Sequence, residues 1–229
     1  MRTVSSKQNP LVKRIREAIR EHAEEIVIEG PKAVADAIAS GWKPIVVISR
    51  GIDVTESVFD SLSETRTTQG VLGLFERPVS NATAILARRD TIAIALDGVQ
   101  DPGNVGTIVR LAAAFDASGV LLLPGSADAY GPKAIRSSAG AILNVPVAKI
   151  TRQELIDAGV PLVSTAMSGS PIDPPALNAV LVFGNEGAGV SEELLARSTQ
   201  IAIAMSSRVE SLNVATSAAI LLARSYAIR

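Results

Sequence analysis

The stretch "TIAIALDGVQDPGNVGTIVRLAAAF", residues 91–115, decides the fold, because a glycine-containing turn joins an unbroken apolar run to an amphipathic pattern. The run 91–96 predicts a buried β-strand, and residues 105–116 predict a helix with its apolar side chains on one face. The N-terminus of a helix that follows such a turn is a frequent site for a phosphate or a nucleotide. The first question is therefore which ligand this turn serves.

The glycine spacing of the turn argues against two classes of nucleotide-binding protein. Gly98, Gly103 and Gly106 do not follow the G-x-G-x-x-G pattern, and the next strand ends in Pro124 rather than in an acid. No G-x-x-x-x-G-K sequence followed by Ser or Thr occurs in the chain. These patterns disfavour a P-loop NTPase and weaken a dinucleotide-dependent oxidoreductase, which a titration with a nicotinamide cofactor would test.

Further unbroken apolar runs extend the same pattern toward the C-terminus. They predict strands at 119–124, 161–167, 179–184 and 200–205. Helices fit between and after them at 132–139, 152–158, 191–197 and 211–226. Strands that are apolar throughout are typical of a mainly parallel sheet with helices on both faces. The predicted fold class is therefore α/β, with ligands expected beyond the carboxyl ends of the strands.

Residues 1–80 predict a separate, small α/β domain, and residues 81–229 the larger one. The N-terminal domain alternates helices and strands, with strands expected at "IVIEG", "PIVVIS" and "GVLGLFE". The segment 78–90 mixes Pro, Asn and Arg and predicts a linker.

Composition excludes several kinds of chemistry. The 229 residues include no cysteine and a single histidine, His22. This composition excludes thiol catalysis, a His–Cys–Asp triad, a His-rich zinc site and the HExxH pattern, and we expect no metal site. No run of about 18 apolar residues and no signal peptide is present, so we expect a cytoplasmic protein without a membrane contact. Net charge is −1, yet the first 20 residues carry six basic side chains against one acid. That basic segment is either a solvated helix face or a phosphate-binding surface.

Three polar turns follow predicted strands. In the first, Asn104 lies in the turn and Arg110 lies off the apolar face of the following helix, where a guanidinium can bind phosphate or remain a solvated charge. In the second, Glu186 lies within "GNEGAG" and is either a turn residue or a hydrogen-bond acceptor for a ligand. In the third, Ser211 is a plausible helix N-cap, or Ser211 and Asn213 face a ligand.

The ordered set "DPGNVGTIVRLAAAF", "LVFGNEGAGVS" and "IAIAMSSRVESLNVATSAAILL" resembles the three motifs of the SpoU (TrmH) family of RNA 2′-O-ribose methyltransferases, within the SPOUT class. Residues 131–147 also resemble the family segment between the first two motifs, and the beginning of the chain resembles the family's small substrate-binding domain. The resemblance implies a C-terminal trefoil knot, a homodimer packed through the knotted domain, and S-adenosylmethionine as the methyl donor.

The resemblance also implies roles for particular residues. The implied cofactor-binding residues are Gly184, Glu186, Ile203, Met205, Leu212 and Asn213. The implied substrate and catalytic residues are Asn104, Arg110 and Ser211. Basic residues expected to bind RNA are Lys7, Lys13, Arg14, Lys133 and Arg136. Ala204 stands where many relatives have Pro, and "SSR" at 206–208 replaces a more usual Gly-containing turn, but neither change removes a functional group.

The chemistry of methyl transfer fits these side chains. The transfer is an in-line displacement, so alignment supplies much of the barrier reduction. An arginine with a pKa above about 12 is a poor base, so we expect Arg110 to clamp phosphate and polarise the hydroxyl, while Ser211, water or the phosphate takes the proton. The accessory domain is N-terminal and resembles those of ribosomal RNA modifiers, so the resemblance favours large-subunit ribosomal RNA as substrate. The alternatives are a tRNA 2′-O-methyltransferase and a catalytically silent dimeric RNA-binding protein.

Overall fold

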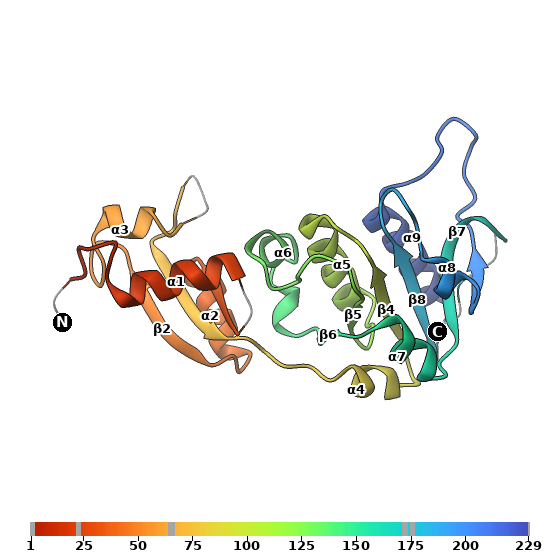
Figure 1. Cartoon of the computed structure of the whole chain (residues 1–229), viewed down its shortest axis with the longest axis horizontal. Coiled ribbons are helices and arrows are strands. Elements are labelled where there is room, and N and C mark those ends of the chain that lie inside the picture. The colour runs from red at the N-terminus through yellow and green to blue at the C-terminus, as the bar shows by residue number, and fades with distance from the viewer. Residues whose placement is uncertain (1–2, 22–23, 64–66, 171–173, 175–176, 229) are drawn as a thin grey trace. The chain divides into compact units, whose positions relative to one another are not determined.

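The computed structural model describes residues 3–21, 24–63, 67–170, 174 and 177–228, so His22 lies outside the described residues. The chain divides into two compact units (Figure 1). Unit 1 consists of Met1–Pro78 with Tyr130–Ile135, and unit 2 of Val79–Ala129 with Arg136–Arg229.

Unit 1 is a three-stranded antiparallel sheet with helices. Its strands β1 (Glu25–Glu29), β2 (Pro44–Ser49) and β3 (Val71–Glu76) lie in the order β1-β3-β2. Its helices are α1 (Pro10–Glu21), α2 (Pro31–Ala39) and α3 (Glu56–Asp60). The core packs Ile15 of α1 and Phe59 of α3 against Leu72 and Leu74 of β3. The three strands that the sequence predicts in this region are thus all present, and helices alternate with them as expected.

Unit 2 contains a parallel sheet in the order β6-β5-β4-β8-β7-β9. Its strands are β4 (Ile92–Asp97), β5 (Val120–Leu122), β6 (Val147–Lys149), β7 (Leu162–Ser170), β8 (Ala179–Gly184) and β9 (Ser198–Ile201). Every pairing within it is parallel, which confirms the predicted sheet. The central strands β4 and β8 are buried along their whole length, as two covered faces require.

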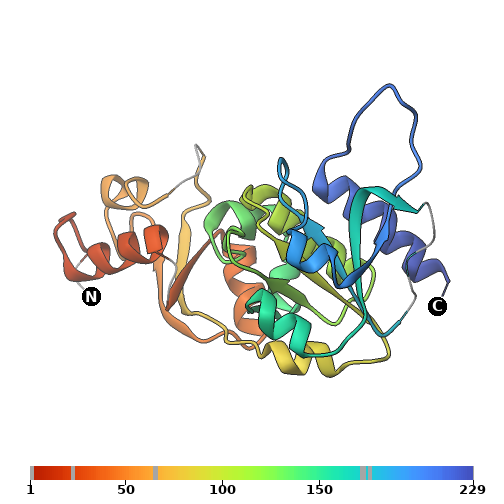
Figure 2. The ribbon, with the colours of Figure 1, turned by 45° about the vertical axis from the view of Figure 1, so that its right-hand side comes forward.

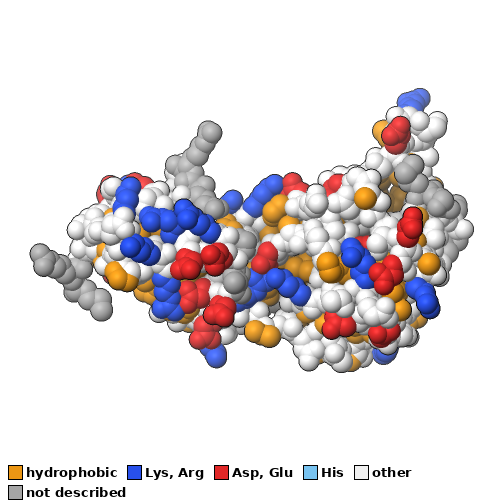
Figure 3. Space-filling view, in the orientation of Figure 1, with side chains coloured by type: hydrophobic (Ala, Val, Ile, Leu, Met, Phe, Trp, Pro, Cys, Tyr) orange, Lys and Arg blue, Asp and Glu red, His pale blue; other side chains and the backbone are white. Residues whose placement is uncertain are grey.

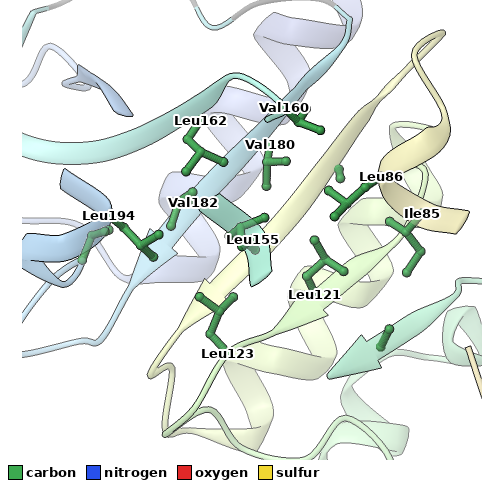
Figure 4. Close-up of a cluster of buried hydrophobic side chains, with 14 residues drawn as sticks. Ile85, Leu86, Leu121, Leu123, Leu155, Val160, Leu162, Val180, Val182 and Leu194 are labelled. Carbon is green, nitrogen blue, oxygen red and sulfur yellow. The ribbon is translucent and has the colours of Figure 1, made fainter. Parts of the chain in front are cut away.

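Helices cover both faces of this sheet. On one face, α4 (Ala82–Ala87), α7 (Arg152–Asp157) and α8 (Glu192–Leu195) pack over alternate residues of β5 and β8, with Leu155 between Leu121 and Val182 (Figure 4). On the other, α5 (Pro102–Ala114) lies against α9 (Val214–Ala227) (Figures 1 and 4). The two shorter elements are α6 (Pro132–Ser137), whose first four residues belong to unit 1, and the 3-10 turn η1 (Ala141–Leu143) of unit 2.

Some boundaries differ from the sequence-based expectation. The last strand is Ser198–Ile201 rather than 200–205, and the residues after it form a loop that projects beyond the sheet in both ribbon views (Figures 1 and 2). The predicted linker contains α4, which Asn81 caps by accepting a hydrogen bond from the Thr83 amide. β6 is a three-residue strand that the apolar pattern did not reveal.

The surface carries mixed charge. Figure 3 shows Lys and Arg side chains beside Asp and Glu side chains on both units, as a net charge of −1 suggests. Among the described helices, none combines the length and the apolarity needed to cross a membrane.

Candidate active site at the carboxyl edge of the parallel sheet

The turns after β4 and β8 are neighbours because their strands pair in parallel, with Asp97 opposite Gly184. Gly98 begins the first turn with φ of 75°, a conformation that favours glycine, and its carbonyl accepts a hydrogen bond from Asn185 Nδ2 at 2.8 Å. Gly184 is required by close backbone approach, since a Cβ there would lie 2.1 Å from the carbonyl carbon of Gly189. The strand order therefore brings the first two predicted motifs into direct contact.

A chain of side-chain hydrogen bonds joins all three motifs. Asn104 Nδ2, in the first turn of α5, donates to Glu186 Oε1 at 2.9 Å. Asn213 Nδ2, at the start of α9, donates to Asn104 Oδ1 at 3.0 Å. These residues lie up to 109 positions apart in sequence, so only the tertiary fold can assemble them.

Glu186 is an ionised acceptor in this chain. Its carboxylate also accepts hydrogen bonds from the backbone amides of Gln100 at 3.2 Å and Asp101 at 3.3 Å. Partial burial works against ionisation, but the hydrogen bonds from the Asn104 side chain and from backbone amides outweigh it and lower the pKa of Glu186. Glu186 is therefore a turn acid that is hydrogen-bonded to the first motif.

The start of α9 is fixed by Asn213 rather than by Ser211. Asn213 Oδ1 accepts from the amides of Ala215 at 2.9 Å and Thr216 at 3.3 Å, so Asn213 is the N-cap. The suggestion that Ser211 caps this helix is wrong, because Ser211 lies two residues before the cap. Ser211 is exposed, and among the described residues it has no hydrogen-bond partner.

Arg110 lies on α5 and is exposed. Helical geometry places it about 9 Å along the axis from Asn104 and about 120° around it. It forms no hydrogen bond or ion pair with the part of the chain that the structure describes. Its guanidinium is therefore available to an external anion, although the structure does not bring it into contact with Asn104, Glu186 or Asn213.

Ile203, Met205 and Leu212 lie in the loop 202–213, which is held at both ends. The amide of Ala202 donates to the carbonyl of Ser170 at 2.9 Å, and Asn213 holds the other end against Asn104. Between these points, residues 207–208 form a turn, and the backbone groups of residues 203–205 and 210–212 have no hydrogen-bond partner within the described chain. Met205 is 44% exposed and Val209 51% exposed. The loop thus offers free backbone donors and acceptors beside uncovered apolar side chains.

The predicted RNA-binding residues fall into two settings. In unit 1, Lys7 and Lys13 are exposed without a partner among the described residues, whereas Arg14 is paired with Glu25. Lys133 and Arg136 are exposed on α6, and both have partners within the protein.

The sequence did not predict the ion pair between Asp97, whose side chain is buried, and Arg152, whose side chain is partly exposed. Asp97, 2% exposed at the end of β4, accepts from Arg152 Nε at 2.7 Å and from the amide of Ser191 at 2.8 Å. An acid that directly follows a fully apolar strand was a usable signal for Asp97. Nothing in the sequence indicates Arg152 as its partner, because 55 positions separate them.

The chain is similar to proteins of one known family. A model of the SpoU rRNA methylase family matches residues 91–223. The chain is similar to the 23S rRNA (guanosine(2553)-2′-O)-methyltransferase RlmP of Bacillus subtilis, with 32% identity over 88% of this chain and 84% of that protein. It is 34% identical to a 23S rRNA (adenosine(1067)-2′-O)-methyltransferase of Streptomyces laurentii over 76% of this chain and 70% of that protein. An AdoMet-bound rRNA methyltransferase from Sinorhizobium meliloti has a similar crystal structure, with a TM-score of 0.90, 29% identity, and coverage of 99% of this chain and 98% of that one.

Proposed function

The chain belongs to the SpoU rRNA methylase family, and from this premise we propose that it transfers a methyl group from S-adenosylmethionine to a ribose 2′-hydroxyl of large-subunit ribosomal RNA. The observation that carries the proposal is the hydrogen-bonded chain Glu186–Asn104–Asn213, which unites the three family motifs at one edge of the sheet. Two relatives with this activity modify a guanosine and an adenosine, so the reaction class is shared while the target nucleotide differs.

The residues at this edge fit S-adenosylmethionine. That cofactor has a polar amino-acid end, an adenine with hydrogen-bonding edges and apolar parts, and the loop 203–212 offers unpaired backbone groups beside Met205. We assign Gly184, Ile203, Met205 and Leu212 to cofactor binding, and we place Glu186 and Asn213 next to the cofactor. When bound, it supplies a methyl group that its sulfonium charge activates for displacement.

The protein's own groups would align and polarise the ribose hydroxyl. Arg110 is free to clamp a substrate phosphate bidentately, which fixes the ribose and favours loss of the hydroxyl proton. Ser211 is exposed and precedes the Asn213 cap by two residues. Its hydroxyl would accept that proton or relay it through water. Asn104 uses both ends of its amide within the protein, so it would serve the substrate by holding Glu186 and Asn213 in register.

RNA contact would extend beyond this edge. We propose that Lys7, Lys13 and Arg14 of unit 1, with Lys133 and Arg136, bind phosphates, and that unit 1 is a substrate-binding domain. Lys7 and Lys13 are the strongest candidates, because the guanidinium of Arg14 is already paired with the carboxylate of Glu25. The homodimer and the trefoil knot remain predictions from the family resemblance.

The proposal is tested by incubating the protein with ribosomal RNA and S-adenosylmethionine labelled in its methyl group, followed by digestion to nucleosides. We expect label in a 2′-O-methylnucleoside, and an at least 100-fold lower rate for Arg110→Ala with cofactor affinity retained, because only transition-state alignment is lost. Label in a base, or no transfer to any RNA despite cofactor binding, would contradict the proposal. The second outcome would favour a silent RNA-binding protein.

A further inference from the structure

The glycine loop that carries Glu186 is internally rigid but needs external anchors. Asn185 and Gly189 exchange two backbone hydrogen bonds at 2.9 Å. The Asn185 side-chain oxygen also accepts from the amides of Gly187 and Ala188 at 2.9 Å. Residues 185–189 therefore move as one body, and their position is set by contacts with the turn after β4.

Those contacts lie at two levels. At the exposed tip, Glu186 accepts from Gln100, Asp101 and Asn104. At the base, Asn185 donates to the Gly98 carbonyl, and the Ser191 amide donates to Asp97 Oδ2 at 2.8 Å. The contact of Asp97 is the charged and buried one, and hydrogen bonds of that kind are about twice as strong as neutral ones.

Arg152 fixes the carboxylate in turn. Its Nε donates to Asp97 Oδ1 at 2.7 Å, and its Nη2 donates to the Pro124 carbonyl at 3.3 Å. One oxygen of Asp97 thus faces α7 while the other faces Ser191, so the carboxylate cannot rotate without breaking a charged contact. Asp97 thereby links the end of β4 directly to Ser191 after β8, and through Arg152 to Pro124 after β5.

We propose that Asp97, oriented by Arg152, is a positioning residue that sets the glycine loop 185–190 for cofactor binding. The inference rests on the proposed function for its ligand. Asp97 itself does not contact the ligand and acts through Ser191. Loss of its carboxylate would let the loop drift away from the turn 98–104, which weakens the cofactor site before it affects the chemistry.

The test compares Asp97→Ala with Ile92→Val. Ile92 is 1% exposed on the same strand, about 16 Å from Asp97, and its truncation lowers stability without touching the carboxyl edge. Cofactor affinity is measured by calorimetry with S-adenosylmethionine, stability by thermal unfolding, and loop order by amide hydrogen exchange in the cofactor-free protein. Asp97→Ala should raise the Kd on the order of tenfold and speed exchange within 185–191, because it leaves the Ser191 amide without its acceptor. Ile92→Val should change neither.

Two further variants keep the test decisive if Asp97→Ala does not fold. Arg152→Gln frees the carboxylate to rotate and should raise the Kd about two- to fivefold with faster exchange in the same segment. Asp97→Asn combined with Arg152→Gln restores an oxygen acceptor without an unpaired charge and should return the Kd to within about threefold of the original. A Kd and exchange pattern unchanged in Asp97→Ala or Arg152→Gln, or an equal effect of Ile92→Val, overturns the inference. If the unaltered protein binds no S-adenosylmethionine, the proposed function fails while the exchange measurement still tests the positioning role.

Discussion

Replacement of Asn213 should separate the stability of α9 from the assembly of the site, since its side chain serves both. Its oxygen caps α9 through Ala215 and Thr216, and its nitrogen donates to Asn104. Loss of an Asn cap costs about 0.5–2 kcal/mol, and loss of one further hydrogen bond about 0.5–1.5 kcal/mol. Asn213→Ala should therefore cost about 1–3.5 kcal/mol. Because 1 kcal/mol shifts Tm by about 2–4 °C in a chain of this size, Tm should fall by roughly 2–14 °C.

Two matched variants divide this effect. Asn213→Ser keeps an oxygen that can cap α9 but is too short to reach Asn104, so it should retain most of the stability while methyl transfer falls about tenfold. Asn81→Ala removes the cap of α4, far along the sheet from the three motifs, and should lower Tm without changing turnover. Differential scanning calorimetry and initial-rate measurements on the same samples give both quantities.

Two outcomes would contradict these roles of Asn213. If Asn213→Ala leaves Tm within about 1 °C of the original, the cap does not stabilise α9 as described. If Asn213→Ser transfers methyl groups at the original rate, the contact between Asn213 and Asn104 has no functional role.

Three other outcomes follow from the same geometry. Gly184→Ala should prevent correct folding or lower Tm by more than 5 °C, because its Cβ would lie 2.1 Å from the Gly189 backbone; normal circular dichroism and Tm would show that the turn can open. Glu186 has a lowered folded pKa, so its stabilising contribution is present above its unfolded pKa of about 4.3 and is lost as pH falls through the lower folded value. Acid titration of stability should therefore show a component that Glu186→Gln removes, and identical profiles would count against it. Doubling the salt concentration should weaken RNA binding more than cofactor binding, because phosphate contacts release counterions; a flat response of RNA affinity would argue against the basic contacts.

The parallel sheet was predictable because unbroken apolar runs require burial on both faces. β4 and β8 follow that rule over all six of their residues, and their positions agree with the apolar pattern to within one residue. β6 escaped notice because it is only three residues long, follows Pro146 and ends at Lys149. β9 was placed too late because the apolar "IAIAM" continues past the last paired residue, Ile201. Apolarity there belongs to the exposed loop rather than to the strand.

The chemistry of single turns was predictable, whereas their partners were not. Asn104, Glu186 and Asn213 stand out in sequence as polar residues at strand or helix ends. The N-cap of α9 is Asn213 rather than Ser211 because the helix begins at Val214. Local sequence predicts the start of a helix only to within a few residues, so it could not distinguish the two caps. The pairing of Asp97 with Arg152 depends on the strand order. Arg152 is the first residue of α7, which follows β6 in the chain and lies on the same side of the sheet as the turn after β8.

The central claim is methylation of ribose in large-subunit ribosomal RNA through the site that includes Arg110. The most direct measurement is transcriptome-wide mapping of 2′-O-methylated riboses in cells that lack this protein, complemented with either the original chain or Arg110→Ala. The account predicts one large-subunit position, or a small set, that is methylated with the original chain and unmethylated with Arg110→Ala. Identical maps in all strains, or a position restored equally by Arg110→Ala, would contradict it.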